Sequence, residues 1–260
     1  MNELENYYLT HDEDGRLLSK HGSVEFITTM KYIGEYLAGV PSPSVLEVGA
    51  GTGRYSVTLA KEGLSVTAVE LFEHNLGILK SKLDGSEPIR VIEGNALDLS
   101  MLDTGSFDLT LLLGPMYHLY TREEKLRALS EAVRVTKKGG IIMVAYCMND
   151  PVIIQYVFAA GHLEEVLAGN MLTRDWHTIS RERDLFEMVR PEEIASLDAG
   201  MPVERLKLVA TDGASHYMSG IIDGMDDTTF GKWIEYHLAV CEREDLIGAS
   251  NHTLDILRKL

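Results

Sequence analysis

A regular alternation of short apolar runs and helical periods, from about residue 44 to residue 146, constrains the fold more than any other feature of this chain. The runs are rich in β-branched residues and almost continuously apolar, which is typical of strands buried on both faces of a sheet. Strands that alternate with helices pair in parallel. We therefore expect an α/β protein whose first five strands lie at 45–48, 65–70, 89–93, 107–113 and 140–146.

Residues typical of helix caps mark the ends of the intervening helices. Gly63 is placed to end the first of them, and Thr121 with Glu124 forms a capping box that begins the fourth. The run 137–140, Lys-Lys-Gly-Gly, is expected to close that fourth helix with positive charge and a left-handed cap.

The alternation breaks after residue 146, and the remaining chain predicts an elaborated single domain over 1–260. Residues 1–40 are expected to form an N-terminal helical cover and residues 150–190 a helical lid insertion. Residues 191–260 should hold a sixth strand at 204–210, a seventh at 253–258 and an amphipathic helix at 226–244 between them.

Composition limits the class of protein. A chain of 260 residues with 45% apolar residues folds as a soluble globular protein. The formal charge of -16 speaks against nucleic acid as a partner, because that binding depends on Lys and Arg neutralising phosphates. The sequence indicates neither a secretory signal nor a membrane span, and two cysteines, Cys147 and Cys241, favour a reducing cytoplasm.

A glycine-rich turn follows the first expected strand, in the segment Glu47-Val48-Gly49-Ala50-Gly51-Thr52-Gly53-Arg54. Such a turn before a helix presents backbone N–H groups to a ligand. A dinucleotide fingerprint would need its third glycine at position 54, where this chain has Arg54, so NAD is disfavoured. The carboxylate of Glu47 would repel a pyrophosphate but would suit a ligand that carries an ammonium group.

Two further strand ends complete a nucleoside pocket. Glu70 ends the second strand, where an acidic side chain accepts hydrogen bonds from both ribose hydroxyls in nucleotide-binding α/β folds. After the third strand, the side-chain amide of Asn95 is placed to hold an adenine amine, while Ala96 and Leu97 pack on the ring. All these groups lie at the carboxyl ends of strands, where open α/β sheets bind ligands.

With these residues the chain resembles the class I S-adenosylmethionine (AdoMet)-dependent methyltransferases, whose motif ExGxGxG is met by Glu47, Gly49, Gly51 and Gly53. The resemblance covers about residues 41–146, which would form the AdoMet-binding half up to residue 149. It implies a Rossmann-like seven-stranded, mostly parallel sheet in the order 3-2-1-4-5-7-6, with the last strand antiparallel and helices on both faces. Where the family often has Asp at the adenine turn, this chain has Asn95.

The resemblance assigns roles to the residues at the strand ends. Glu47 and the glycine turn would hold the methionine moiety, Glu70 the ribose, and the turn after the third strand the adenine. The cofactor-binding residues implied in this way are Glu47, Gly49, Ala50, Gly51, Gly53, Glu70, Leu71, Asn95, Ala96, Leu97 and Leu113.

The acceptor side, from Leu113 to His118, departs from the known patterns. Gly114 lacks the side-chain oxygen that orients a nitrogen acceptor, so nucleobase N-methylation loses support. Catechol-type enzymes need carboxylates after strands four and five, where only residues 149–150 are placed to serve, and we expect no metal. His118 is a candidate proton acceptor or a helix cap, and Tyr117 is a candidate orienting group or pocket wall.

Other aromatic and histidine residues keep two interpretations. His177 and His216 would line an acceptor pocket or lie at the surface, and His237 is expected to pack in the core. Tyr7 and Tyr8, with Arg16 after them, lie in a segment placed to close over the cofactor.

The resulting hypothesis is an AdoMet-dependent methyltransferase that acts on a small-molecule acceptor by direct in-line methyl displacement and releases S-adenosylhomocysteine. One alternative is a methyltransferase of proteins or RNA. Another is an AdoMet-binding sensor or partner protein without transferase activity, and NAD-dependent oxidoreduction is a more distant one. The acceptor and the oligomeric state stay undetermined at this level.

Overall fold

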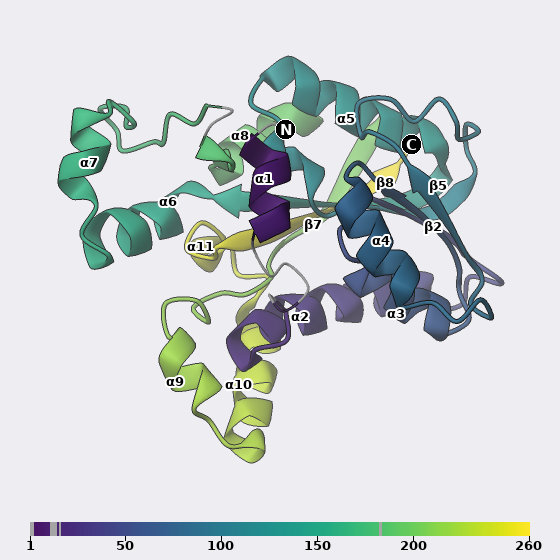
Figure 1. Cartoon of the computed structure of the whole chain (residues 1–260), viewed down its shortest axis with the longest axis horizontal. Coiled ribbons are helices and arrows are strands. Elements are labelled where there is room, and N and C mark those ends of the chain that lie inside the picture. The colour runs from purple at the N-terminus through teal and green to yellow at the C-terminus, as the bar shows by residue number, and fades with distance from the viewer. Residues whose placement is uncertain (1–2, 11–14, 16, 182–183) are drawn as a thin grey trace.

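An eight-stranded sheet with a strong twist forms the centre of the protein in a computed structural model that describes residues 3–10, 15, 17–181 and 184–260 (Figure 1). Seven strands follow the order β3-β2-β1-β4-β5-β8-β7, and β6 pairs with β5 beside this path. The strands are β1 (Ser44–Val48), β2 (Ser65–Glu70), β3 (Ile89–Glu93), β4 (Phe107–Leu112), β5 (Thr136–Met148), β6 (Met188–Val189), β7 (Val203–Ala210) and β8 (His252–Lys259).

The strand directions confirm the predicted topology. Strands β1 to β5 pair in parallel, and β8 runs antiparallel between β5 and β7. Strands β7 and β8 are the predicted sixth and seventh strands, so the order matches 3-2-1-4-5-7-6. All strands of the parallel set therefore end at one edge of the sheet, and the antiparallel β8 begins at that same edge.

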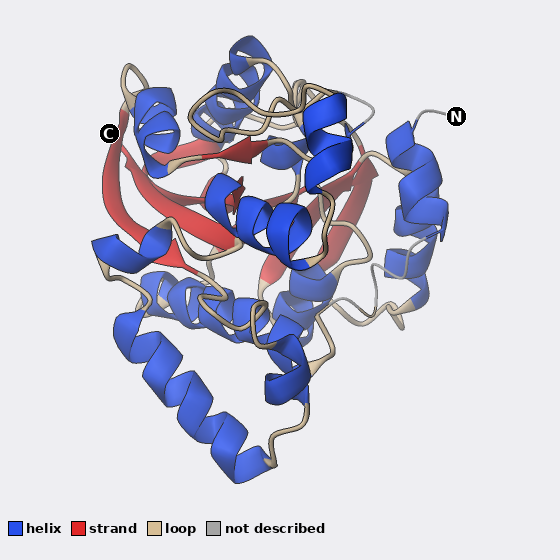
Figure 2. Ribbon diagram, turned by 90° about the vertical axis from the view of Figure 1, so that its left-hand side faces the viewer, coloured by secondary structure: helices blue, strands red, loops and turns tan. Residues whose placement is uncertain are grey.

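Helices cover both faces of the sheet (Figure 2). On one face, α2 (Lys20–Leu37) and α3 (Arg54–Lys61) pack Tyr32 and Leu59 against Leu109 and Leu111 of β4. On the other face, α5 (Arg122–Val135) and α8 (Pro191–Asp198) bury Leu129 and Ile194 against alternate residues of the same strands. The near-continuous apolar runs of the central strands are explained by this burial on both sides.

Two predicted boundaries were wrong. The fourth predicted helix, α5, ends at Val135, and residues 137–140 belong to the beginning of β5. The Thr136 hydroxyl donates to Ala132 O at 2.6 Å and contacts Thr110, so the chain enters the sheet without a separate cap. The expected helix 226–244 is divided into α10 (Asp227–Val240) and α11 (Glu244–Ile247).

Several segments are added around this core. Helix α1 (Glu3–Thr10) lies next to α4 (Glu73–Ser81), and α9 (Ser219–Asp223) and α10 lie next to α2. The segment after β5 forms α6 (Asn149–Val152), the π-helix η2 (Ile153–Ala159) and α7 (Leu163–Ala168), which project to the left in Figure 1. Within the described residues, no helix is both long and apolar enough to cross a membrane.

Candidate cofactor and acceptor site

A cavity of about 250 Å³ lies at the carboxyl ends of β1, β2 and β4. It is lined by every predicted cofactor residue except Gly53, and also by Tyr117 and His118 from the short 3-10 helix η1 (Pro115–His118) after β4. Side chains that are 71 positions apart, those of Glu47 and His118, thus line one cavity, because the parallel strands end at the same edge of the sheet.

The glycines of the turn have different functions. Gly53 begins α3 with φ +85°, and a Cβ there would lie 2.6 Å from Leu79 Cγ, so this glycine allows close packing of two helices. Gly51, with φ +54°, lines the cavity, and a Cβ there would meet nothing within 4 Å. Gly51 therefore leaves room for a ligand, whereas Gly53 leaves room for the protein itself.

Glu70 joins the ends of β1 and β2. Its buried carboxylate accepts hydrogen bonds from Gly51 N at 2.8 Å and from Phe72 N at 3.0 Å. Oε1 also accepts from Asn75 Nδ2 at 3.4 Å, whereas Oε2 can accept a second hydrogen bond. Glu70 can therefore hold the glycine turn in position and still accept from a ribose hydroxyl in the cavity through Oε2.

Glu47 is almost fully buried at the end of β1. Its Oε2 accepts from Ser56 N at 2.8 Å and from the Ser56 hydroxyl. Burial raises the pKa of this carboxyl to about 8, against the opposing effect of the Ser56 hydrogen bonds. An ammonium group beside Glu47 would favour the carboxylate form.

The adenine turn is arranged differently from our expectation. The Oδ1 atom of Asn95 accepts a hydrogen bond from Leu97 N at 2.9 Å, so the side chain stabilises the turn to which it belongs. The same oxygen keeps one lone pair. Ala96 is buried and Leu97 is partly buried beside it, so an apolar surface for a ring is present.

Helix α1 covers the cavity through Leu4 and Tyr8, and Leu17 adds to this cover. The Tyr8 hydroxyl lies 2.8 Å from His118 Nε2, and His118 Nδ1 lies 2.8 Å from Leu185 O. Since a carbonyl oxygen only accepts, Nδ1 carries the proton, and Nε2 accepts from Tyr8 when the ring is neutral. The ring of Phe186 packs against His118, with centroids 5.3 Å apart.

Desolvation lowers the pKa of His118 to about 4, despite the opposing hydrogen bond to Leu185. The ring is therefore neutral near pH 7. Tyr117 packs edge-on against His118 and donates its hydroxyl to Leu113 O at 3.1 Å. We name the group Tyr7, Tyr8, Tyr117, His118 and Phe186 the aromatic cluster, since their rings contact one another beside the cavity, which Tyr8, Tyr117 and His118 line.

Other candidates lie elsewhere. The ring nitrogens of His177 contact Thr178 O and Glu193, outside the cavity. His216 lies near the end of β7, and His237 is buried on α10. Arg16 lies outside the described residues.

Sequence reasoning missed Arg54 as a residue of the cavity. Its guanidinium lies 4.3 Å above the Phe26 ring, and its buried Nε has no hydrogen-bond partner among the described residues. Arg54 lies in the first turn of α3, where a cation is unfavourable because it opposes the helix dipole. This unusual position is the sequence signal that could have identified Arg54. Arg54 would suit a ligand carboxylate.

The comparisons with known proteins agree with this geometry. Residues 46–144 match a family model described as a methyltransferase domain. A ubiquinone biosynthesis O-methyltransferase of Pseudomonas paraeruginosa is 28% identical over 64% of this chain and 68% of its own length. A demethylmenaquinone methyltransferase of Renibacterium salmoninarum is 37% identical over 42% of this chain and 43% of its own length.

A solved structure resembles the whole chain. A SAM-dependent methyltransferase of Thermotoga maritima, titled a possible histamine N-methyltransferase, aligns with a TM-score of 0.61 at 19% identity, covering 99% of this chain and 100% of that one. The chain matches the curated relatives over shorter stretches. It covers 40% of the length of the putative methyltransferase YqeM of Bacillus subtilis.

The fold, the glycine motif and the matched domain define a Rossmann-like, seven-stranded methyltransferase architecture. Residues 46–144 thus match a methyltransferase domain, and the fold is consistent with the class I AdoMet-dependent methyltransferases.

Replacing Glu70 tests the cofactor site. Glu70→Ala should weaken binding of S-adenosylhomocysteine by about 1.5 to 3 kcal/mol, roughly ten- to more than a hundredfold, because a charged acceptor is lost. Calorimetric titration measures this. Glu93→Ala is the matched control, since Glu93 ends β3 as the register partner of Glu70 but is exposed and outside the cavity. Equal affinity of Glu70→Ala and wild type would contradict the assignment.

Glu47→Gln tests the buried carboxyl through pH. Because its pKa is about 8 in the folded chain and near 4.5 when unfolded, the folded state retains the proton and loses stability as pH rises between these values. The variant should therefore gain stability over wild type from pH 5 to pH 8, measured by urea denaturation without ligand. The exposed control Glu93→Gln should show no such trend. A gain that shrinks with rising pH would refute the interpretation.

Proposed function

We propose that this protein methylates a small, largely apolar molecule with AdoMet as methyl donor. The observation that carries the proposal is the cover over the cavity, where α1 contributes Leu4 and Tyr8 and the aromatic cluster closes the side next to η1. A polymer would have to displace this cover, whereas a small acceptor can be enclosed by it. Two relatives are named as methyltransferases of ubiquinone biosynthesis and of demethylmenaquinone, and these names refer to small molecules. The similarity supports this class of acceptor.

The residues of the cavity fit AdoMet. The open side of Gly51 leaves space for the ligand, Glu70 Oε2 has a lone pair for a ribose hydroxyl, and Arg54 Nε is available to a carboxylate. Glu47 would face the ammonium group, and the turn from Asn95 would hold the adenine. When bound, AdoMet supplies a methyl group activated by a sulfonium.

The protein's own contribution is positioning and exclusion of water. An acceptor atom must approach in line with the methyl group, and rigid walls around a bound pair of reactants supply much of the rate enhancement. Pro115 and Tyr117 form the wall after β4, and α1 would shield a bound acceptor from solvent on its side of the cavity. An amine acceptor would need no further help from the protein.

A hydroxyl or thiol acceptor has to lose a proton, and we propose His118 as its acceptor. Nε2 is the ring nitrogen that faces Tyr8, and it carries the lone pair in the neutral tautomer. An acceptor that replaced the Tyr8 hydroxyl at Nε2 would deliver its proton there. Tyr117 would orient the acceptor against the same wall.

Methylation of a protein or RNA is the second candidate. The formal charge of -16 argues against RNA. A third candidate, an AdoMet-binding protein without transferase activity, differs only in the absence of turnover.

A panel of acceptors tests the proposed class. Wild-type protein with AdoMet should release S-adenosylhomocysteine with at least one group of small molecules, such as phenols, thiols or amines, and not with total protein or RNA. Mass spectrometry of product and acceptor measures this. Turnover only on protein or RNA would favour the second candidate, and tight AdoMet binding without any turnover would favour the third.

His118→Gln tests the proton acceptor once a hydroxyl or thiol acceptor is known. We expect kcat to fall about 10²- to 10⁴-fold, because positioned proton transfer contributes that much. Because the pKa of His118 is about 4, the wild-type rate should show no dependence on this group from pH 5.5 to 8. His162→Gln is the control, since His162 is partly exposed, pairs with Glu165 and does not line the cavity. An unchanged kcat in His118→Gln would exclude this role.

A further inference from the structure

Histidines gather around one buried carboxylate at the edge of the sheet where β7 ends and β8 begins. Asp212 follows β7, His252 begins β8, and His216 lies one turn after Asp212. His21 of α2 lies against His216, with ring centroids 5.3 Å apart. In the strand order, β5 separates this group from the strand ends that form the cofactor cavity. None of its members lines that cavity.

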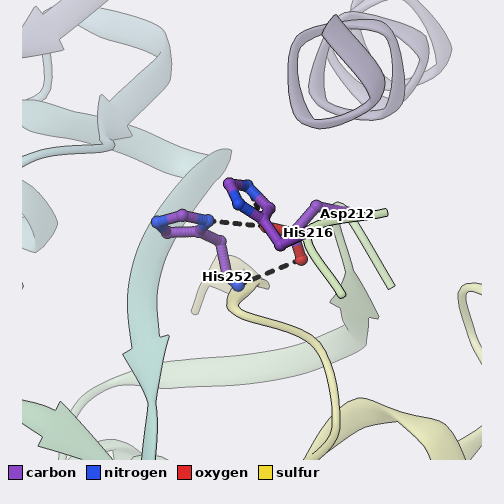
Figure 3. Close-up of side chains that lie close together, drawn as sticks. All are labelled: Asp212, His216 and His252. Atoms are coloured by element: carbon purple, nitrogen blue, oxygen red, sulfur yellow. Dashed lines mark hydrogen bonds and ion pairs between the residues drawn. The ribbon is translucent and has the colours of Figure 1, made fainter. Parts of the chain in front are cut away.

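Three side chains direct ligand-type atoms at one point (Figure 3). Asp212 Oδ2 lies 2.7 Å from His252 Nδ1 and 3.3 Å from His216 Nε2, and all three atoms lie within 4.8 Å of one another. A fourth group comes from α2, because Glu25 Oε2 lies 3.5 Å from His252 Nδ1. Asp212 is fully buried, and Glu25 is almost fully buried.

Hydrogen bonding accounts for only part of this arrangement. His252 Nδ1 bonds to Asp212 Oδ2, and Ser250 Oγ donates to Asp212 Oδ1 at 2.5 Å. His216 Nε2, however, is a buried ring nitrogen without a hydrogen-bond partner in the described part of the chain, although it lies close to Asp212. A buried polar atom of this kind requires a partner.

We propose that Asp212, His216, His252 and Glu25 form a binding site for a divalent transition-metal ion of the Zn²⁺ type. Imidazole nitrogens and carboxylate oxygens bind Zn²⁺ at about 2.0 to 2.2 Å. In a tetrahedral site such ligand atoms lie roughly 3.3 to 3.6 Å apart, and two of the observed separations, 3.3 and 3.5 Å, fall in this range. The Asp212–His252 contact of 2.7 Å has to widen, with loss of the proton between the two atoms, and the remaining separations have to come within this range when the ion binds.

The surrounding residues prepare Asp212 for this role. Its second oxygen, Oδ1, accepts from the Ser250 hydroxyl and from His252 N at 3.2 Å. Such bonds to the outer atom of a ligating carboxylate fix its orientation at metal centres. The Oδ2 atom is thereby directed at the two imidazoles.

The ion would join three elements that are distant in sequence, namely α2, the segment after β7 and the start of β8. Next to Glu25 on α2, Phe26 packs against Arg54 of the cofactor cavity, so the ion would also stabilise one wall of that cavity. The proposal departs from our expectation of no metal, which was based on the ends of β4 and β5 alone. Asn149, at the end of β5, bonds to Trp176 O and Thr178 N, so its side-chain amide is already engaged by the chain.

The test is metal binding by the full-length protein after treatment with a chelator. We expect calorimetry to give one Zn²⁺ ion per chain with a dissociation constant of about 10 µM or below, together with a rise in the thermal midpoint. Co²⁺ should give the intense visible absorption of a four-coordinate site. His216→Ala removes one proposed ligand and should weaken Zn²⁺ binding more than about tenfold. The variant should still fold, because His216 is partly exposed and its removal leaves the Asp212–His252 hydrogen bond intact.

His162→Ala is the matched control, because His162 also pairs with a carboxylate, Glu165, but at the surface. Its affinity for Zn²⁺ should equal that of wild type. Asp212→Asn provides a second variant, with circular dichroism as the check of folding. Absence of Zn²⁺ binding by wild type, or unchanged affinity in a folded His216→Ala, would overturn the proposal.

Discussion

Burial of the central strands on both faces decides where polar chemistry can occur in this protein. Strands β1 and β4 lie between α2 and α3 on one side and α5 and α8 on the other, and Leu46, Leu109 and Leu111 are fully buried there. A charged group inside these layers would lose its hydration, so functional groups are confined to the strand ends. Parallel pairing then brings the ends of β1, β2 and β4 to one edge, where they form the cavity.

The cavity combines groups that serve the fold with groups that serve a ligand. Glu70 is an example of both, because it holds the Gly51 amide of the neighbouring strand end while lining the cavity. Glu47 lies in a less polar environment, and its raised pKa is the consequence. Desolvation also lowers the pKa of His118, so its ring is neutral near pH 7.

The same sheet edge carries the second cluster, around Asp212. Antiparallel pairing of β8 with β5 and β7 brings His252 beside the end of β7, so the C-terminal strands contribute polar groups where the parallel strands end. Helix α2 contacts both regions, because Phe26 packs against Arg54 of the cavity and Glu25 lies at the cluster.

The sequence by itself determined the central strands, the glycine turn and the positions of Glu47, Glu70 and Asn95 at strand ends, because these depend on local periodicity and on a contiguous motif. The strand order was implied by the resemblance to class I methyltransferases. Tertiary structure decided the features that depend on contacts between distant segments. The cover by Tyr8 on His118, 110 positions apart, and the approach of His216 to His252 have no local signal. The two-residue strand β6 is too short for a periodic pattern, and β5 begins at Thr136 because its hydroxyl bonds to α5 and β4. Local patterns specify secondary structure and its edges, whereas packing specifies which edges meet.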